Sequence, residues 1–273
     1  MSERYTSTIR CVTAAGADPT LAGKRALVTG AGQGIGATIA GQLAAAGCEL
    51  LVNDFVADRA EAVAAEIVAA GGSAKALPFD VTDHDAVSAA ISGADGVDIL
   101  VNNAGNGGVD TFGAIAPFVG TTPADWEPVI AVNLYGVMNC THSVLPHMTA
   151  SGWGRVITIS SDAGRTGGAR YAAYSGAKAG AAGFSRAIAR EVARFNITVN
   201  VVSLGTMRTP MTEQLWTDAG SDEMRRSILS SYLVRRPGEP ADVAWAVLML
   251  ASPRSEWITG QTIAVNGGSS MTL

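Results

Sequence analysis

Tyr174 and Lys178 stand four residues apart in the stretch Y-S-G-A-K, and together they could carry out acid–base chemistry. On a helix, residues four apart share a face and lie about 6 Å apart along the axis, so an ammonium can act on a phenol. A free tyrosine has a pKa near 10, and bringing it to neutrality requires roughly 4 kcal/mol of preferential stabilisation of the phenolate. A fixed cation in a partly desolvated site can supply this, so we expect Lys178 to lower the pKa of Tyr174.

Two simpler interpretations stand beside this one. Tyr171 carries the same side chain, but it precedes Lys178 by seven residues, about 10 Å along a helix, which makes Tyr174 the better candidate. A tyrosine and a lysine four apart also occur on ordinary solvated helices. The assignment therefore depends on the elements that surround the pair.

Short runs rich in β-forming residues alternate with alanine-rich helical stretches from Lys24 onward. Strands that are apolar on both faces and separated by helices are typical of a parallel sheet covered on both sides. We predict an α/β fold with one Rossmann-type, doubly wound parallel sheet in three layers, α/β/α. Helices are expected before Gly47, over about 58–70, before the run VDILVNNAG, over about 123–149, around Tyr174 and over about 240–251.

The chain is predicted to hold one domain, residues 23–273, preceded by an extension over residues 1–22 that has no clear period. Between about 206 and 236 the alternation of strand and helix patterns stops, and we predict a small helical substrate lid there. Met224, Ile228 and Tyr232 fall on one helical face of it, which could line an apolar pocket or pack on the body.

The composition narrows the class of function. With 48% hydrophobic residues, a net charge of −5 and no basic run, the chain shows no electrostatic footprint for nucleic acid or an anionic membrane. The three cysteines are widely spaced and no run of 18 apolar residues occurs, so we expect a cytoplasmic protein with a small-molecule substrate. His84, His142 and His147 lack further ligands at metal spacing, so no metal is expected.

A glycine-rich turn, T-G-A-G-Q-G-I-G, joins the first predicted strand to a helix. Glycines at 30, 34 and 36 let the backbone turn sharply and approach a pyrophosphate, with helix N-terminal amides pointing at it. Its position between a strand and a helix predicts a dinucleotide site. The residues expected to contact the nucleotide there are Gly30, Gln33, Gly34, Ile35 and Gly36.

Asp54 ends the second predicted strand, where a carboxylate can accept hydrogen bonds from both ribose hydroxyls of NAD. A 2′-phosphate about 4 Å away would meet a like charge, at a cost on the order of 4 kcal/mol. We therefore predict NAD rather than NADP, and the neutral Gln33 in the glycine turn agrees. Arg59 could weaken this preference, and Asp54 could instead cap a helix.

The whole set of motifs resembles the short-chain dehydrogenase/reductase family over residues of about 23 to 268. The motifs are TGAGQGIG, Asp80-Val81, Asn102-Asn103-Ala104-Gly105, Asn133, Ser161 and YSGAK, in one order and at consistent spacings. The resemblance implies that Asp80 and Val81 contact the adenine and that Asn103, Ala104 and Gly105 support the adenosine side and the central strand. Asn102 and Asn103 could also simply cap a strand.

The resemblance also implies a catalytic set of Asn133, Ser161, Tyr174 and Lys178. Ser161 would orient the substrate oxygen, and Tyr174 would exchange the hydroxyl proton while a hydride moves between the same carbon and the nicotinamide. Lys178 would bind the nicotinamide ribose, and Asn133 would kink its helix and hold a water in a proton path. Thr209 matches a residue that contacts the carboxamide, although Leu204 stands where proline is usual.

The implied activity is NAD-dependent interconversion of a secondary alcohol and a ketone, on a cyclic, steroidal or 3-hydroxyacyl-CoA-type substrate. Arginines 225, 226, 235 and 236 could meet coenzyme A phosphates or be solvated, and residues 106–121 could form a pocket wall or a subunit contact. An epimerase or dehydratase with bound NAD and a non-catalytic NAD-sensing module remain as alternatives. The family resemblance also suggests a homotetramer, or a homodimer, paired through the long helices.

Overall fold

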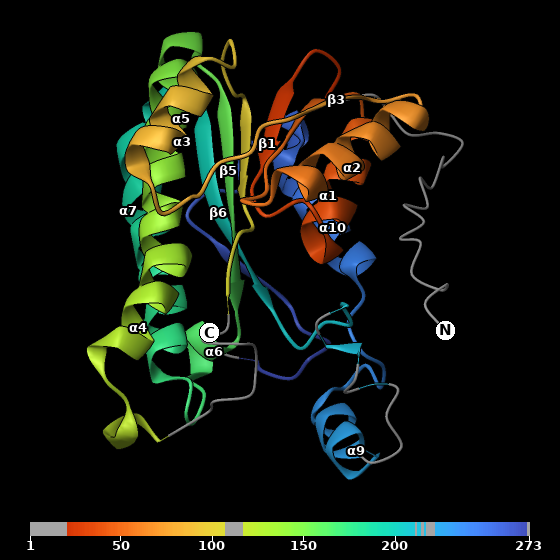
Figure 1. Ribbon diagram of the computed structural model, residues 1–273, viewed down its shortest axis with the longest axis vertical. Helices are drawn as coiled ribbons and strands as arrows, with labels where there is room; N and C mark the ends of the chain where they lie inside the picture. The colour runs from red at the N-terminus through yellow and green to blue at the C-terminus, as the bar shows by residue number, and fades with distance from the viewer. Residues whose placement is uncertain (1–20, 107–116, 211, 214–215, 217–221, 272–273) are drawn as a thin grey trace.

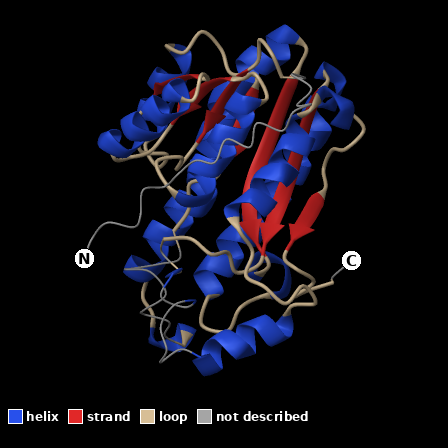
Figure 2. Ribbon diagram, turned by 90° about the vertical axis from the view of Figure 1, so that its right-hand side faces the viewer, coloured by secondary structure: helices blue, strands red, loops and turns tan. Residues whose placement is uncertain are grey.

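Seven strands in the described part of the chain form one parallel sheet in the order β3-β2-β1-β4-β5-β6-β7. The computed structural model describes residues 21–106, 117–210, 212–213, 216 and 222–271. The strands are β1 (Arg25–Val28), β2 (Glu49–Val52), β3 (Ser73–Ala76), β4 (Ile99–Asn102), β5 (Gly154–Ser161), β6 (Ile197–Leu204) and β7 (Thr262–Val265). The arrowheads point to one end of the sheet, so the loops after the strands gather there (Figure 2).

Helices cover both faces of this sheet and confirm the predicted doubly wound α/β fold (Figure 1). One face carries α1 (Gly34–Ala45), α2 (Ala57–Ala69) and α10 (Pro240–Ala251). The other carries α3 (His84–Ser92), α5 (Gly136–Ser151) and α7 (Ala172–Val192). Each layer packs a separate apolar cluster against the strands, which explains why β1, β2 and β4 read as continuous apolar runs.

The strand order reverses between β1 and β4, which are direct neighbours. In open α/β sheets, ligands bind in the crevice outside the carboxyl ends of the strands at such a switch point. The glycine turn after β1 and the N-N-A-G segment after β4 therefore border the same crevice.

The helix predicted over about 123–149 is present from Pro123 to Ser151, but it is broken in the middle. It consists of α4 (Pro123–Ile130), a π-helical turn η2 (Ala131–Tyr135) and α5. Asn133 lies in that turn and its side-chain amide donates to the carbonyl of Val129, 2.9 Å away. A π turn widens the helix locally, which frees a side chain to point at a site.

The lid region holds α9 (Asp222–Ser231), which lies beyond the carboxyl ends of the strands (Figure 1). A parallel bridge between Met207 and Gly238 joins the segments that enter and leave this region. Tyr232 is 6% exposed and its hydroxyl accepts from the amide of Thr206 at 2.8 Å, so this residue packs on the body. The side chains of Met224 and Ile228 lie outside the described structure, as do residues 1–20 and 107–116, where the extension and most of the predicted pocket wall fall.

None of the helices in the described ranges is long and apolar enough to cross a bilayer.

Candidate active site

The glycine turn adopts the close approach that a nucleotide cradle requires. Gly30 and Gly34 have left-handed φ angles of 61° and 56°. A Cβ on Gly36 would lie 2.4 Å from the carbonyl oxygen of Gly30 and 2.5 Å from the side-chain Nδ2 of Asn103, so only glycine fits. Gln33 and Ile35 flank the start of α1, whose amino end faces the crevice.

Asn103 fastens this turn to β4. Its side-chain amide donates to the carbonyls of Thr29 at 2.9 Å and Gly30 at 3.0 Å. The Thr29 hydroxyl in turn accepts from the amides of Asn103 and Ala104, both at 3.0 Å. The role expected for Asn103 and Ala104 in supporting the central strands is thus visible as hydrogen bonds.

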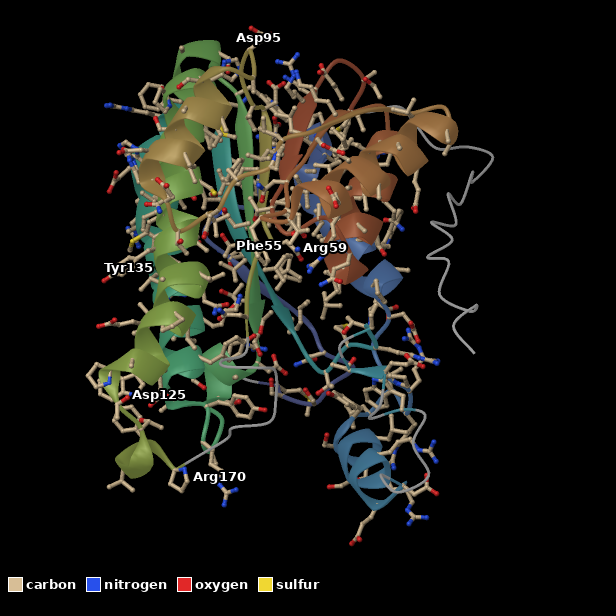
Figure 3. All side chains as sticks on the ribbon, in the orientation of Figure 1. Phe55, Arg59, Asp95, Asp125, Tyr135 and Arg170 are labelled. Atoms are coloured by element: carbon tan, nitrogen blue, oxygen red, sulfur yellow. The ribbon has the colours of Figure 1, made fainter. Side chains whose placement is uncertain are left out.

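Asp54 lies against the glycine turn with only 4% of its surface exposed. Its carboxylate accepts from the amide of Gly32 at 3.2 Å and from the amide of Val56 at 3.0 Å, so it faces the glycine turn and closes a tight turn just before α2. Arg59 is 3.9 Å away from the carboxylate, and its guanidinium lies beside the exposed ring of Phe55 (Figure 3). Because α2 starts with Val56 as its N-cap and without a side-chain cap, the alternative that Asp54 caps a helix is wrong, whereas a ribose acceptor fits this geometry.

Asp80 and Val81 follow β3 on the adenine side of the predicted site. The Asp80 carboxylate accepts from the amide and the hydroxyl of Thr82, at 2.9 and 2.8 Å, and forms a tight turn. Val81 is buried, and its carbonyl accepts from the side chain of Asn139 on α5.

Asn133, Lys178 and Gly105 meet at one point above the sheet. Asn133 is fully buried and its amide nitrogen donates to Asn106 and Val129, whereas its Oδ1 has no hydrogen-bond partner among the described residues. A Cβ on Gly105 would lie 2.9 Å from that Oδ1 and 3.3 Å from the Lys178 ammonium. An orphaned acceptor next to a buried ammonium fits a water between them.

Ser161 and Tyr174 come together from β5 and α7. Ser161 is the last residue of β5, and its hydroxyl lies close enough to the Tyr174 phenol to lower the pKa of that phenol. Lys178 lies below the phenol on the same helix, 5.7 Å from the centre of its ring, and donates to the carbonyl of Ile159 at 2.9 Å. The tyrosine thus lies near both the serine and the lysine: the four-residue spacing predicts its proximity to the lysine, and the family resemblance implies its proximity to the serine.

The pKa shifts of Tyr174 and Lys178 differ from the sequence expectation. Burial raises the pKa of Tyr174, the hydrogen bond with Ser161 lowers it in part, and Tyr171 raises it further. Burial lowers the pKa of Lys178 to about 8. The predicted lowering of the Tyr174 pKa by Lys178 is therefore wrong for the protein's own residues, because the ammonium is bonded to Ile159 and burial of the phenol dominates.

Thr209 closes the crevice from the lid side. A Cβ on Gly34 would lie 4.0 Å from the Thr209 Cβ, which places this threonine opposite the glycine turn. Its amide donates to the Thr212 hydroxyl at 2.9 Å.

One residue at this site was missed from the sequence, namely Asp162. It directly follows Ser161, and its carboxylate joins three strand ends. An acidic residue at the end of an otherwise apolar strand was the signal that could have revealed it. Within the described ranges, no three His, Cys, Asp or Glu side chains cluster as metal ligands.

Comparison with known proteins agrees with this arrangement. A family model described as enoyl-(acyl carrier protein) reductase matches residues 30–270. Nodulation protein G of Rhizobium sp. (strain N33) is 39% identical over 255 residues, covering 92% of this chain and 98% of that protein. The 3-oxoacyl-[acyl-carrier-protein] reductase FabG of Staphylococcus aureus is 40% identical over 253 residues, covering 91% and 98%.

Solved structures of similar chains include sugar-acid dehydrogenases. A putative gluconate dehydrogenase from Agrobacterium tumefaciens superposes with a TM-score of 0.87 at 31% identity, covering 94% of this chain and 99% of that one. A gluconate 5-dehydrogenase from Burkholderia cenocepacia J2315, in complex with NADP and tartrate, gives 0.85 at 32% identity, covering 94% and 99%. The chain belongs to the short-chain dehydrogenase/reductase family. It is an oxidoreductase of that type, acting on a secondary alcohol or a ketone.

Proposed function

We propose that the protein interconverts a secondary alcohol and a ketone with NAD(H), through proton transfer by Tyr174. The observation that carries the proposal is the meeting of Ser161, Tyr174, Lys178 and Asn133 at the carboxyl end of the sheet, beside the glycine turn. The nicotinamide supplies a hydride acceptor in oxidation and a hydride donor in reduction.

The chain's own residues handle the proton. In oxidation the Tyr174 phenolate takes the hydroxyl proton from the substrate, and in reduction the phenol returns it to the carbonyl oxygen. Ser161 donates to the same substrate oxygen and fixes it against the phenol. Lys178 would hold a ribose hydroxyl, and the unpaired Oδ1 of Asn133 would hold a water that connects the lysine to solvent.

The preference for NAD rests on Asp54. Its buried carboxylate faces the glycine turn where the adenosine ribose would lie, and a 2′-phosphate there would meet a like charge. Arg59 opposes this preference, because its guanidinium reaches the same carboxylate. Two solved relatives hold NADP: the gluconate 5-dehydrogenase from Burkholderia cenocepacia J2315, 32% identical to this chain, and a putative 2-deoxy-D-gluconate 3-dehydrogenase from Agrobacterium tumefaciens, 35% identical.

Two matched substitutions separate these opposing charges. Asp54→Ala should lower the ratio of kcat/KM for NAD to kcat/KM for NADP by about ten-fold or more. Each ~1.4 kcal/mol of repulsion between Asp54 and the 2′-phosphate that the substitution removes changes this ratio by a factor of ten. Arg59→Ala should raise the ratio or leave it unchanged. An unchanged ratio in Asp54→Ala would remove the argument for NAD.

For the substrate we propose a cyclic, steroidal or 3-hydroxyacyl-thioester alcohol whose pocket lies between Tyr174 and a lid over about 206–236. Two of the lid-region arginines that could meet phosphates are already paired, Arg225 with Asp222 and Arg236 with Asp242 at 2.6 Å. Because these arginines are already paired, we expect the neutral part of the substrate, rather than any phosphates, to contribute most to its binding. A cavity of ≈ 390 Å³ at the lid base, lined by Met207 and Tyr232 among others, does not include the Ser161 and Tyr174 side chains.

We further propose a homotetramer in which α5 and α7 pair with the same helices of a second copy. Tyr135, the residue just before α5, supports this, because it is 57% exposed and its side chain points away from the sheet (Figure 3). Sedimentation at micromolar concentration would test it, and a monomer at that concentration would refute it.

A further inference from the structure

Asp162 gathers the ends of three neighbouring strands onto one carboxylate. Its Oδ1 accepts from the Ser203 hydroxyl on β6 at 3.0 Å, and its Oδ2 accepts from the Asn266 amide after β7 at 2.7 Å. The hydroxyls of Ser269 and Ser270 also donate to Oδ2, at 2.8 and 2.9 Å. The carboxylate is 15% exposed, so these bonds are made largely out of water, where charge-assisted bonds are strong.

The backbone of Asp162 is held equally firmly. Its amide donates to the carbonyl of Leu204 at 2.9 Å, and its own carbonyl accepts from the amides of Arg165 and Thr166 in the short helix α6 (Ala163–Thr166). Arg165 adds an ion pair with the carboxylate, 3.4 Å away. Main chain and side chain thus leave this residue with one position.

Because Ser161 directly precedes Asp162 in the chain, the contacts that fix Asp162 also fix the backbone of Ser161. Its hydroxyl accepts from the amide of Ala163 at 3.2 Å, so the Ser161 side chain is folded over the same turn that Asp162 anchors. That hydroxyl lies beside the Tyr174 phenol and lowers the pKa of the phenol. A shift of the turn would move the serine away from the phenol and from the substrate oxygen.

We infer that Asp162 is a positioning residue, which holds Ser161 in register with Tyr174 by tying the end of β5 to the segment 266–270. This rests on the proposed function of Ser161 and Tyr174. Asp162 acts through Ser161, so its removal should slow the chemical step and leave substrate binding nearly unchanged.

The conservative variant Asp162→Asn has a defined defect. The amide nitrogen of Asn266 would lose its charged acceptor and keep only its bonds to the carbonyl and hydroxyl of Ser270, and the hydroxyls of Ser269 and Ser270 would lose the same carboxylate oxygen. Exchanging the two groups in Asp162→Asn/Asn266→Asp restores a carboxylate opposite an amide. The exchange should recover most of the activity that the single variant loses.

Asp98 offers a matched control. It is 17% exposed and its carboxylate also ties strand residues together, accepting from the Arg25 amide at 2.9 Å, but at the amino end of the sheet. Asp98→Asn should lower stability and leave kcat and its pH dependence unchanged.

The decisive experiment is a double-mutant cycle on kcat between Asp162→Asn and Ser161→Ala. In the wild-type background Asp162→Asn should lower kcat by about ten-fold, whereas in the Ser161→Ala background it should have almost no effect, because coupled residues are not additive. Asp162→Asn should also shift the pH profile of alcohol oxidation to higher pH, and Ser161→Ala should do the same. Ser269→Ala, which removes one of the bonds, provides a milder variant if Asp162→Asn does not fold.

Two results would count against the account in different ways. If Asp162→Asn, or Ser269→Ala in its place, slows the Ser161→Ala enzyme by the same factor as the wild type, the positioning role is wrong and the catalytic assignment stands. If Tyr174→Phe and Ser161→Ala are both fully active, the proposed function itself fails.

Discussion

A half-buried phenol determines the chemistry at the scale of single residues. The protein's own residues raise the pKa of Tyr174, so the phenol form predominates at neutral pH. Oxidation requires the phenolate, whereas reduction requires the phenol. We therefore expect kcat/KM for alcohol oxidation to climb between pH 7 and 9 while that for ketone reduction stays level from pH 6 to 7.5. Steady-state rates in both directions check this, and an oxidation rate that falls over pH 7 to 9 would contradict it.

Lys178 connects catalysis to stability. Burial lowers its pKa from 10.5 to about 8, so below pH 8 the folded protein holds a buried ammonium at a cost of about 3 kcal/mol. The unfolded chain binds the extra proton between pH 8 and 10.5, so the free energy of unfolding should rise with pH across that window. Lys178→Met should be more stable than the wild type at pH 7 by up to ~3 kcal/mol, and its free energy of unfolding should no longer rise between pH 8 and 10.5. The variant should also be nearly inactive. Denaturant unfolding at pH 7 and 9.5 measures both effects, and a destabilised Lys178→Met would refute the argument.

At the scale of elements, the close packing of the glycine turn sets nucleotide binding. A Cβ on Gly36 would collide with backbone and with the Asn103 amide that fastens the turn. We expect Gly36→Ala to weaken NADH binding at least about ten-fold and to lower stability by roughly 1–3 kcal/mol. Gly183→Ala on α7 is the control, because the nearest atom is the tip of Arg186 at 3.8 Å. It should keep NADH affinity and gain up to ~1 kcal/mol from helix propensity. Fluorescence titration and thermal unfolding compare the two, and equal effects would contradict the role of the turn.

The elements themselves follow from sequence patterns, and the exceptions have local causes. The helix over 240–251 is predicted at its observed ends, because Pro240 begins it and Glu239 with Asp242 forms its capping box. The family resemblance implies a kink at Asn133, and the π turn at 131–135 lies there. Hydrophobic periodicity alone does not predict this turn, because the hydrogen bond from Asn133 to a backbone carbonyl one turn away leaves no periodic pattern in the sequence.

At the scale of the whole molecule, motif order predicts which residues meet but not how their charges balance. Ser161, Tyr174 and Lys178 come together because β5 and α7 are adjacent, and the spacing of the motifs encodes that. The direction of the Tyr174 pKa depends on burial by distant segments, which no local pattern reports. The tie between Asp162 and Ser270 spans 108 residues and emerges only when β5, β6 and β7 are side by side.

The central claim is that Tyr174 transfers the proton in a nicotinamide-dependent oxidation or reduction. The most direct measurement is the change in absorbance of NADH with a panel of secondary alcohols and ketones, including acyl-CoA thioesters, for the wild type and Tyr174→Phe, with Tyr171→Phe as control. The account predicts that Tyr174→Phe loses about 10²- to 10⁴-fold in kcat with NADH affinity nearly unchanged, and that Tyr171→Phe stays active. A Tyr174→Phe enzyme as fast as the wild type would contradict it.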